Sequence, residues 1–428
     1  MTVQGGESDF DLIIVGGGLV GMSLAHALAG SRLRMALVEA VAPSIATDPD
    51  YDERSTALSP STRRIFQALG CWEAVEGASA AIREIHVSDQ GGFGMTRMKA
   101  ADEGLEALGY VVPNRVLGRV LGERIADQSN LTIYRPAEVE RLEDHGDHVS
   151  LRVRADGEGM TLRARLAAAA DGSRSALRAQ LGVAARETDY GQTGITATVT
   201  TSLPSDGRAF ERFTRTGPLA MLPLPGGHCS LVWTVRSDTA EHLLALPDDA
   251  FLAELQQAFG FRLGRLLRVG RRAAWPLSLV RSRQRRQGRT VMVGNAANTL
   301  HPVAGQGFNL ALRDVAELAE QVHDATATGG DPGADQVLKR YLAARAPDDR
   351  RVVTFTDSLV RLFSNRLPGV RLGRNLGLVA MELFPASRRW LMRQAMGRGV
   401  RPSRLARGLP LQSIPEQRAA DNRSAANG

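Results

Sequence analysis

A glycine-rich turn close to the start of the chain constrains the fold more than any other feature. Residues 13–28 read IIVGGGLVGMSLAHAL, so an apolar run leads into glycines and then into residues typical of a helix. A continuous apolar run is typical of a parallel strand that is buried on both faces. Gly16 permits a tight turn, Gly18 lets the backbone approach a pyrophosphate, and Gly21 lets the helix pack closely on the strand.

The residues that follow complete a strand–helix–strand unit over residues 10–40. The second strand is expected at residues 33–39 and ends on Glu39. An acid at this distance from the glycines binds ribose hydroxyls, which favours NAD or FAD over NADP. The helix N-terminus offers free N–H groups and a favourable dipole to the phosphates. The sequence therefore predicts a dinucleotide-binding unit, although this turn does not distinguish NAD from FAD.

Two later segments repeat the pattern of a strand, a glycine turn and a helix. Residues 166–178 read LAAAADGSRSALR, and residues 289–314 read RTVMVGNAANTLHPVAGQGFNLALRD. Between them, residues 190–280 carry alternating patterns typical of antiparallel strands, with a helix near 248–259. We therefore expect a mixed α/β fold in which a doubly wound, Rossmann-type domain is assembled from discontinuous segments.

The same patterns predict where each domain lies. The nucleotide-binding domain is expected to comprise residues 1–75, 105–180 and 281–330, and a β-rich substrate domain residues 76–104 and 181–280. A helical C-terminal region at 331–400 is a candidate for facing a membrane. The remaining residues, 401–428, are basic and then polar, and are expected to form a disordered tail.

Composition narrows the class of protein. The formal net charge of +7 is compatible with nucleic acid, anionic lipid or a phosphate-bearing ligand. Aromatic residues make up only 5% and do not alternate with basic ones, which argues against nucleic acid. The two cysteines lie far apart and build no metal site, so we expect free thiols in a reducing compartment. No run of about 18 apolar residues occurs, and we expect a cytoplasmic protein.

Two arginine-rich segments leave alternatives open. Residues 281–289 contain five arginines, which form either a solvated loop or a site for nicotinamide phosphate or lipid headgroups. Residues 388–407 contain seven arginines and no acid, interleaved with apolar side chains. That pattern suits an interfacial helix on the inner face of the membrane, or a helix packed on the protein body.

The three motifs together resemble the group A flavoprotein aromatic hydroxylases. The strings ADGSRSALR and GNAANTLHPVAGQGFNLALRD carry the resemblance, with the first glycine turn. Residues 207–225 (GRAFERFTRTGPLAMLPLP) and 370–384 (VRLGRNLGLVAMELF) narrow it to the ubiquinone-biosynthesis hydroxylases, and most closely to their 2-octaprenyl-6-methoxyphenol hydroxylase branch. The resemblance covers residues 9–396.

The resemblance implies FAD as cofactor and NAD(P)H as reductant. It places the first turn at the pyrophosphate, the DG segment beside it, and the third segment at the ribityl chain and flavin ring. The implied cofactor residues are Gly16, Gly18, Gly21, Glu39, Arg54, Arg119, Asp171, Gly172, Gly294, Asn295, Pro302, Gly305, Gln306, Gly307 and Asn309. Physical chemistry independently supports the last group, because a helix opening at GQGFN can stabilise an anionic reduced flavin by about 0.3–2 kcal/mol.

One of these positions departs from the wider family. Asn295 follows Gly294 where that family commonly has aspartate, and asparagine is what the ubiquinone branch shows. An amide still accepts a hydrogen bond from a ribityl hydroxyl and can also donate one. It removes a negative charge beside the flavin, which should favour the reduced state.

The reaction implied is hydroxylation of a polyprenyl-phenol ring by O2, through a C4a-hydroperoxide of the flavin. A base that deprotonates the phenol would help, and His301 is the candidate, although a turn histidine bonded to backbone is the alternative. The β-rich segment should form the substrate wall. Candidates there, each of which could instead be a core residue, are Phe213, Leu219, Met221, Pro223 and Trp233.

Other functions stay open. Within flavoenzymes the alternatives are hydroxylation at another ring carbon, a prenyl-lipid reductase or a halogenase. The halogenase pattern W-x-W-x-I-P is absent, since the four tryptophans are isolated. A different class is a flavin-binding subunit without turnover in a membrane-associated quinone-synthesis complex.

Overall fold

A parallel sheet forms around the first predicted strand. The computed structural model describes residues 9–42, 54–301, 305–364, 368–384 and 402–411. The sheet has the strand order β18-β19-β11-β1-β2-β8, and β1 pairs in parallel with β11 on one side and β2 on the other. Its strands are β1 (Phe10–Val15), β2 (Met35–Val38), β8 (Leu131–Tyr134), β11 (Glu158–Ala169), β18 (Arg286–Gln287) and β19 (Thr290–Met292).

The chain leaves β1 in one direction to β2 and later returns on the other side as β11. Such a reversal of strand order opens a crevice at the carboxyl ends of the strands, where nucleotides bind. All three glycine motifs follow strands of this sheet, namely β1, β11 and β19. The mixed α/β class predicted from the sequence is confirmed, with its sheet assembled from segments far apart in the chain.

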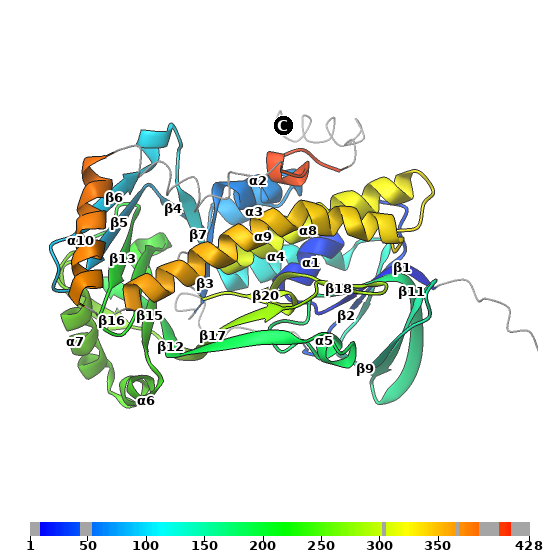
Figure 1. The fold of residues 1–428 in the computed structure, drawn as a ribbon, viewed down its shortest axis with the longest axis horizontal. Coiled ribbons are helices and arrows are strands. Elements are labelled where there is room, and N and C mark those ends of the chain that lie inside the picture. Colours follow the sequence, from blue (N-terminus) through cyan, green and yellow to red (C-terminus); the bar gives the residue numbers. More distant parts are fainter. Residues whose placement is uncertain (1–8, 43–53, 302–304, 365–367, 385–401, 412–428) are drawn as a thin grey trace, which may run out of the picture.

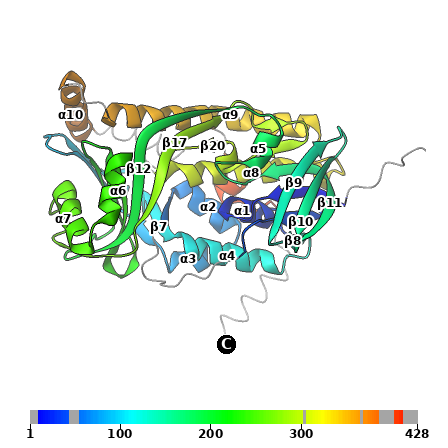
Figure 2. The same cartoon turned by 90° about the horizontal axis from the view of Figure 1, so that it is seen from below.

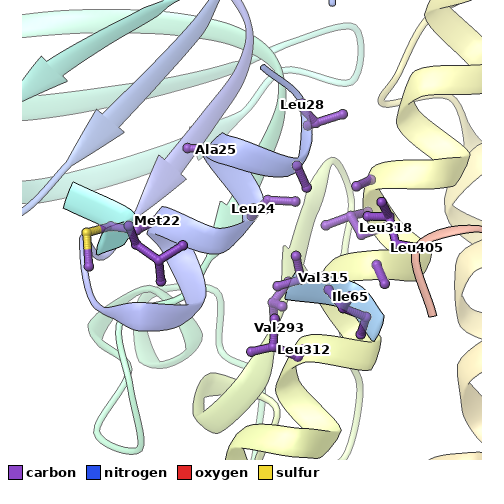
Figure 3. Close-up of a cluster of buried hydrophobic side chains, with 14 of the residues drawn as sticks. Met22, Leu24, Ala25, Leu28, Ile65, Val293, Leu312, Val315, Leu318 and Leu405 are labelled. Carbon is purple, nitrogen blue, oxygen red and sulfur yellow. The ribbon is translucent and has the colours of Figure 1, made fainter. Parts of the chain in front are cut away.

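Helices cover one face of the parallel sheet. Leu12 and Ile14 are fully buried in the core that the sheet forms with this helical layer. Figure 1 shows the two longest helices, α8 and α9, running side by side. Figure 3 shows part of that core, where Leu24, Leu312 and Val315 are labelled. The helices of the layer are α1 (Leu19–Ala27), α2 (Pro60–Ala68), α3 (Trp72–Glu76), α4 (Asn114–Ala126), α8 (Gln306–Ala327) and α9 (Asp335–Ser364).

The opposite face is covered by a hairpin and a short helix. Ile13 and Val15 alternate with the residues above and pack into this second core, as the period of two in a strand requires. These elements are β9 (Ala137–Asp144), β10 (Val149–Ala155) and α5 (Ala176–Gln180). The two strands belong to the same sheet, because β10 pairs antiparallel with the first part of β11 and with β9.

A second, mostly antiparallel sheet has the order β20-β17-β12-β15-β14-β13-β5-β6, with β16 beside β12. Figures 1 and 2 place the two sheets toward opposite ends of the molecule, with the long strands β12 and β17 running between them. Its strands are β5 (Glu84–Asp89), β6 (Met95–Lys99), β12 (Ala185–Thr201), β13 (Arg208–Phe213), β14 (Pro218–Pro223), β15 (His228–Arg236), β16 (Leu266–Val269), β17 (Ala273–Ser282) and β20 (Asn298–Thr299).

The two faces of this second sheet have different neighbours. One face packs on α6 (Ser237–Ala245) and α7 (Asp248–Phe259) in a hydrophobic core. At the far edge, α10 (Pro368–Leu383) contacts β5 and β6. A small third sheet orders β3 (Ser55–Leu58), β7 (Gly109–Pro113) and β4 (Ala80–Ile82). The remaining short helices are η2 (Ala100–Glu103), η3 (Pro225–Gly227), η4 (Gly294–Ala296) and η6 (Leu405–Arg407).

Part of the expected disordered tail is ordered. Residues 402–411 form η6 and neighbouring turns, where Leu405, Ala406 and Leu411 are buried against the helical layer. Arg64 on α2 donates a hydrogen bond to the carbonyl of Ala406. The prediction was wrong here because the segment as a whole is polar in composition, whereas these few apolar residues pack into the core beside the helical layer. The domain boundaries stay a prediction, and residues 412–428 lie outside the described part of the chain.

Candidate active site

The first glycine turn follows β1, and glycine is needed at its positions for different physical reasons. Gly16 has φ of 107°, and a Cβ there would lie 2.5 Å from the carbonyl oxygen of Ala170. A Cβ on Gly21 would clash with the carbonyl oxygen of Gly16. A Cβ on Gly18, the N-cap of α1, would meet no atom within 4 Å. Protein packing therefore requires Gly16 and Gly21, whereas Gly18 leaves open space at a helix N-terminus that suits a phosphate.

Glu39 reaches this turn from the end of β2. Its carboxylate accepts hydrogen bonds from the N–H of Gly17 at 2.5 Å and the N–H of Val41 at 2.7 Å. The acid predicted to bind ribose hydroxyls therefore lies beside the glycines, where the sequence spacing placed it.

The DG turn after β11 lies next to the first turn, because Ala170 donates to the carbonyl of Val15 at 2.8 Å. Asp171 accepts a bond from the N–H of Leu177 through Oδ2, while Oδ1 is buried and has no partner among the described residues. Gly172 has φ of 83°, which favours glycine. A buried carboxylate oxygen without a donor is costly, so it fits a ligand that supplies one.

Arg178 connects the second motif to the third. Its guanidinium donates to the carbonyl of Ser173 and to that of Ala296, each at 2.9 Å. Gly294, with φ of 61°, sits between α1 and α8, since a Cβ there would lie 3.2 Å from Val20 and Ala311. The three motifs are therefore brought together around one crevice, although they span almost 300 residues of sequence.

The start of α8 forms a second open helix N-terminus. Gly305, its N-cap, has φ of 60°, and a Cβ there would lie 3.2 Å from Cβ of Ala57. Gly307 would meet nothing within 4 Å, whereas Gln306 is buried. Asn295 is exposed and, together with Gly305–Gly307, lines a large apolar cavity. Pro302 lies outside the described residues.

Asn309 has a structural role in this arrangement. Its Oδ1 accepts from the N–H of Ser59 at 2.8 Å and the hydroxyl of Thr62 at 2.6 Å. Its Nδ2 donates to the carbonyls of Ala57 and Gly305 at 2.8 and 2.7 Å. All of its hydrogen-bonding capacity is used within the protein, so it positions the glycine turn on β3 and leaves no group for the cofactor.

The two arginines predicted at the cofactor differ in placement. Arg54 lies over the ring of Trp275 at 4.9 Å and lines a smaller cavity of about 330 Å³, together with Arg115 and His228. Arg119 is exposed and pairs with Glu123 one turn along α4, at 3.2 Å. A phosphate contact by Arg119 stays a prediction.

A cavity of about 1060 Å³ lies beyond the start of α8. One wall contains β3 and Gly305–Gly307. A second wall is a face of the sheet formed by β6, β5, β13, β14 and β15, and a third comes from α9 and α10. Most lining side chains are apolar, as in a site for a small hydrophobic molecule. The size and walls suit an aromatic ring that carries a long apolar chain.

Only one of the five predicted wall residues faces this cavity. Phe213 lines it. Leu219, Met221 and Trp233 instead lie in the core against α6 and α7, and Pro223 has the same phase along β14. The cavity is lined by the alternate residues of β14, namely Pro218, Ala220 and Leu222. The prediction failed because both faces of β14 are apolar, so the alternation did not show which face was which.

His301 is not one of the described residues that line the cavity. It is buried, its ring packs edge-to-face on Tyr190 with centroids 5.4 Å apart, and burial lowers its pKa to about 4. The ring is therefore neutral at ordinary pH. The geometry favours a turn histidine over a proton-transfer group.

Sequence reasoning missed Glu211, a carboxyl that lines the cavity on β13. Burial raises its pKa to about 7. Its surface faces the cavity and not the surrounding solvent, so the side chain is partly accessible yet strongly desolvated. The sequence signal that could have revealed this residue is an acid within a mostly apolar strand, residues 209–213 (AFERF).

Behind Gly294 lies a buried ion-pair cluster. Asp314 on α8 binds Arg345 at 2.7 Å and Arg285, and these arginines hold its pKa below the ordinary value against the opposing effect of burial. Arg313 binds Asp348 at 2.7 Å. Arg285, Arg286 and Arg289 of the segment 281–289 are each paired with a carboxylate. That segment therefore serves largely to hold α8 and α9.

Residues 9–356 match the family model described as the FAD binding domain. The chain belongs to a family of FAD-dependent hydroxylases, as this match and two hydroxylase relatives at 41% and 31% identity show. This FAD-dependent hydroxylase is 41% identical to a ubiquinone hydroxylase of Rhodospirillum rubrum, over 94% of this chain and 93% of the relative. It is 31% identical to the 3-demethoxyubiquinol 3-hydroxylase of Escherichia coli, over 90% of this chain and 98% of the relative.

Solved structures show the same fold. The hydroxylase superposes on p-nitrophenol 4-monooxygenase from Pseudomonas putida with a TM-score of 0.76 at 18% identity, covering 92% of this chain and all of that one. FAD as cofactor and NAD(P)H as reductant, predicted from the sequence, agree with the family. The open N-termini at Gly18 and Gly307 and the partnerless Asp171 oxygen fit such a dinucleotide.

Proposed function

We propose that this FAD-dependent monooxygenase hydroxylates the ring of a polyprenyl-phenol in ubiquinone biosynthesis, with NAD(P)H and O2. The specific reaction proposed is the conversion of 2-polyprenyl-6-methoxyphenol to the 1,4-benzoquinol. The observation that carries the proposal is the apolar cavity of about 1060 Å³ that opens directly on the Gly305–Gly307 turn. Ubiquinone hydroxylases among the relatives support the substrate class.

The residues that would hold FAD follow from the three motifs. The first turn and Glu39 would bind the adenosine and pyrophosphate half. Asp171 would lie beside it, and the start of α8 with Asn295 would bind the flavin half. Bound FAD supplies electron transfer from NAD(P)H and the activation of O2. The chain itself binds the ring, orients it and excludes water through its apolar walls.

Access for a prenyl chain would come from the α9–α10 side of the cavity. Leu359 of α9 and Met381 of α10 line that wall, and Leu362 both lines it and is partly exposed. Nearby, Leu376, Leu383 and Phe384 present apolar side chains to solvent. No helix in the described part of the chain is long and apolar enough to cross a bilayer. We therefore propose peripheral attachment to a membrane through this surface, where the substrate resides.

The position of hydroxylation is the finest part of the proposal. The Escherichia coli relative is named a 3-hydroxylase, so another ring carbon is the alternative. Mass spectrometry of quinone intermediates in a deletion strain distinguishes them. Accumulation of a prenyl-methoxyphenol is expected, whereas accumulation of a methylated benzoquinol would show that another carbon is hydroxylated.

Turnover by the purified holoenzyme tests the activity itself. 2-Geranyl-6-methoxyphenol should stimulate NAD(P)H oxidation and take up one oxygen atom from labelled O2. If the protein binds FAD but no prenylphenol stimulates NAD(P)H oxidation, the proposal is contradicted and a non-catalytic subunit of a quinone-synthesis complex is favoured.

A further inference from the structure

Glu211 stands at the centre of the sheet face that lines the cavity. It lies in register with Val87 on β5 and Ala220 on β14, and its same-face neighbours along β13 are Ala209 and Phe213. Residues directly opposite in an antiparallel pair, such as Glu211 and Ala220, have Cβ atoms about 4.5–5.5 Å apart. The carboxyl is therefore surrounded by apolar side chains and has no hydrogen bond or ion pair with any described residue.

The charged groups nearby are engaged elsewhere. Arg374 of α10 also lines the cavity, but its Nη2 lies 2.7 Å from Oδ2 of Asp89, which accepts a further bond from Asn375. Arg212 has the opposite phase along β13 and donates to the carbonyl of Ala258 at 2.9 Å. His86 packs edge-to-face on Phe210, also away from the cavity. Glu211 therefore remains an uncompensated acid in an apolar chamber.

Two hydroxyls on the same wall also lack partners. Thr96 pairs with Val87 across β5 and β6, which puts it in one row with Glu211. Thr96 and Thr234 on β15 are among the residues that line the cavity, but their Oγ1 atoms are buried within the wall and have no described partner. Buried polar groups are normally hydrogen-bonded, so these two hydroxyls leave unused hydrogen-bonding capacity just beneath the surface of the cavity.

We propose that Glu211 accepts the phenolic proton of the substrate during hydroxylation, an inference that rests on the proposed function. The O–H bond of the phenol breaks, and the proton moves to a carboxylate oxygen of Glu211. The electron pair left on the phenolic oxygen delocalises onto the ortho and para carbons, which become better acceptors for electrophilic oxygen. O2 is the oxidant and NAD(P)H the reductant. One oxygen atom enters the ring and the other leaves as water. The two product hydroxyls and the water take up the hydride of NAD(P)H, one proton from solvent, the displaced ring proton and the proton that Glu211 returns, so the carboxylate is regenerated.

The test compares wild-type holoenzyme with Glu211→Gln, which keeps the shape and removes the base. The probe is 2-geranyl-6-methoxyphenol. We expect kcat for hydroxylation to fall by about 10²–10⁴-fold, with FAD content and the rate of flavin reduction unchanged. The wild-type kcat should rise with pH through about 7 as the carboxyl ionises, and the variant should lose this limb. Glu241→Gln, an exposed residue on α6, is the matched control.

A binding measurement keeps the two proposals separable. At pH 8, difference absorbance should show the bound phenol as phenolate in wild type and as neutral phenol in Glu211→Gln. A variant with wild-type kcat, pH profile and phenolate spectrum would overturn the role of Glu211. Wild-type enzyme that shows the Glu211-dependent phenolate spectrum but forms no product would instead overturn the proposed function.

Discussion

The unpartnered carboxyl of Glu211 should make the folded protein less stable as pH rises. Its folded-state pKa is raised from the ordinary 4.5 to about 7 by burial. Between these values the folded state binds a proton that the unfolded state has released, so the free energy of unfolding falls with increasing pH. The penalty is absent below about pH 4.5 and complete above about pH 7. Each tenfold change in proton affinity is worth about 1.4 kcal/mol, so the full penalty is about 3 kcal/mol.

Glu211→Gln removes this penalty, since an amide of the same shape does not ionise. Urea denaturation of wild type and variant at pH 5 and pH 8, at one FAD concentration, measures the effect. The variant should be more stable than wild type by about 3 kcal/mol at pH 8, and the difference should shrink to about 1 kcal/mol or less at pH 5. Glu241→Gln should behave alike at both values. An equal difference between Glu211→Gln and wild type at the two pH values would refute the reasoning.

Three further predictions concern the cofactor site and its support. Gly18→Ala should keep the unfolding midpoint but weaken FAD binding at least about tenfold by calorimetry, since its Cβ enters only open space, whereas Gly21→Ala should unfold far more easily because its Cβ clashes with backbone. Asp314→Asn should lower the free energy of unfolding, measured by urea denaturation near pH 7, by about 3–5 kcal/mol, because it leaves buried arginines without their carboxylate. The pKa of Asp314 in the folded state is below its ordinary value of 3.8, so its stabilising contribution is fully present above that value and is lost as the pH falls through the lowered pKa. Asn295→Asp should lower the flavin reduction potential in a dye-coupled titration, by about 20 mV for roughly 1 kcal/mol of added repulsion; an unchanged or raised potential would contradict the role of the amide.

Local requirements of the backbone made the cofactor motifs predictable. Gly16 and Gly294 adopt positive φ in the turns that directly follow their strands, which favours glycine, although the atoms that a Cβ would meet there come from distant segments. Glu39 follows its strand at a distance set by one strand–helix–strand unit, and the structure places it beside the turn. Each of these features depends on a short stretch of chain.

Partners distant in sequence decided the rest. Asn309 belongs to the flavin-side motif, yet its amide is used by Ser59 and Thr62, about 250 positions earlier. The arginines at 281–289 suggested a ligand site, but carboxylates of α8, of α9 and of the loop between them pair with three of these arginines. No local pattern reveals such neighbours.

The sequence by itself determined the class of fold and the three glycine turns, because glycine conformation and strand periodicity are local properties, while the family resemblance that these motifs carry implied FAD as the cofactor. Only the tertiary structure decided which face of β14 lines the cavity, since apolar residues occupy both faces and a shift of one residue exchanges them. It also decided that Glu211, and not His301, stands in that cavity. Burial and missing partners make an acid chemically significant, and both are properties of the folded chain alone.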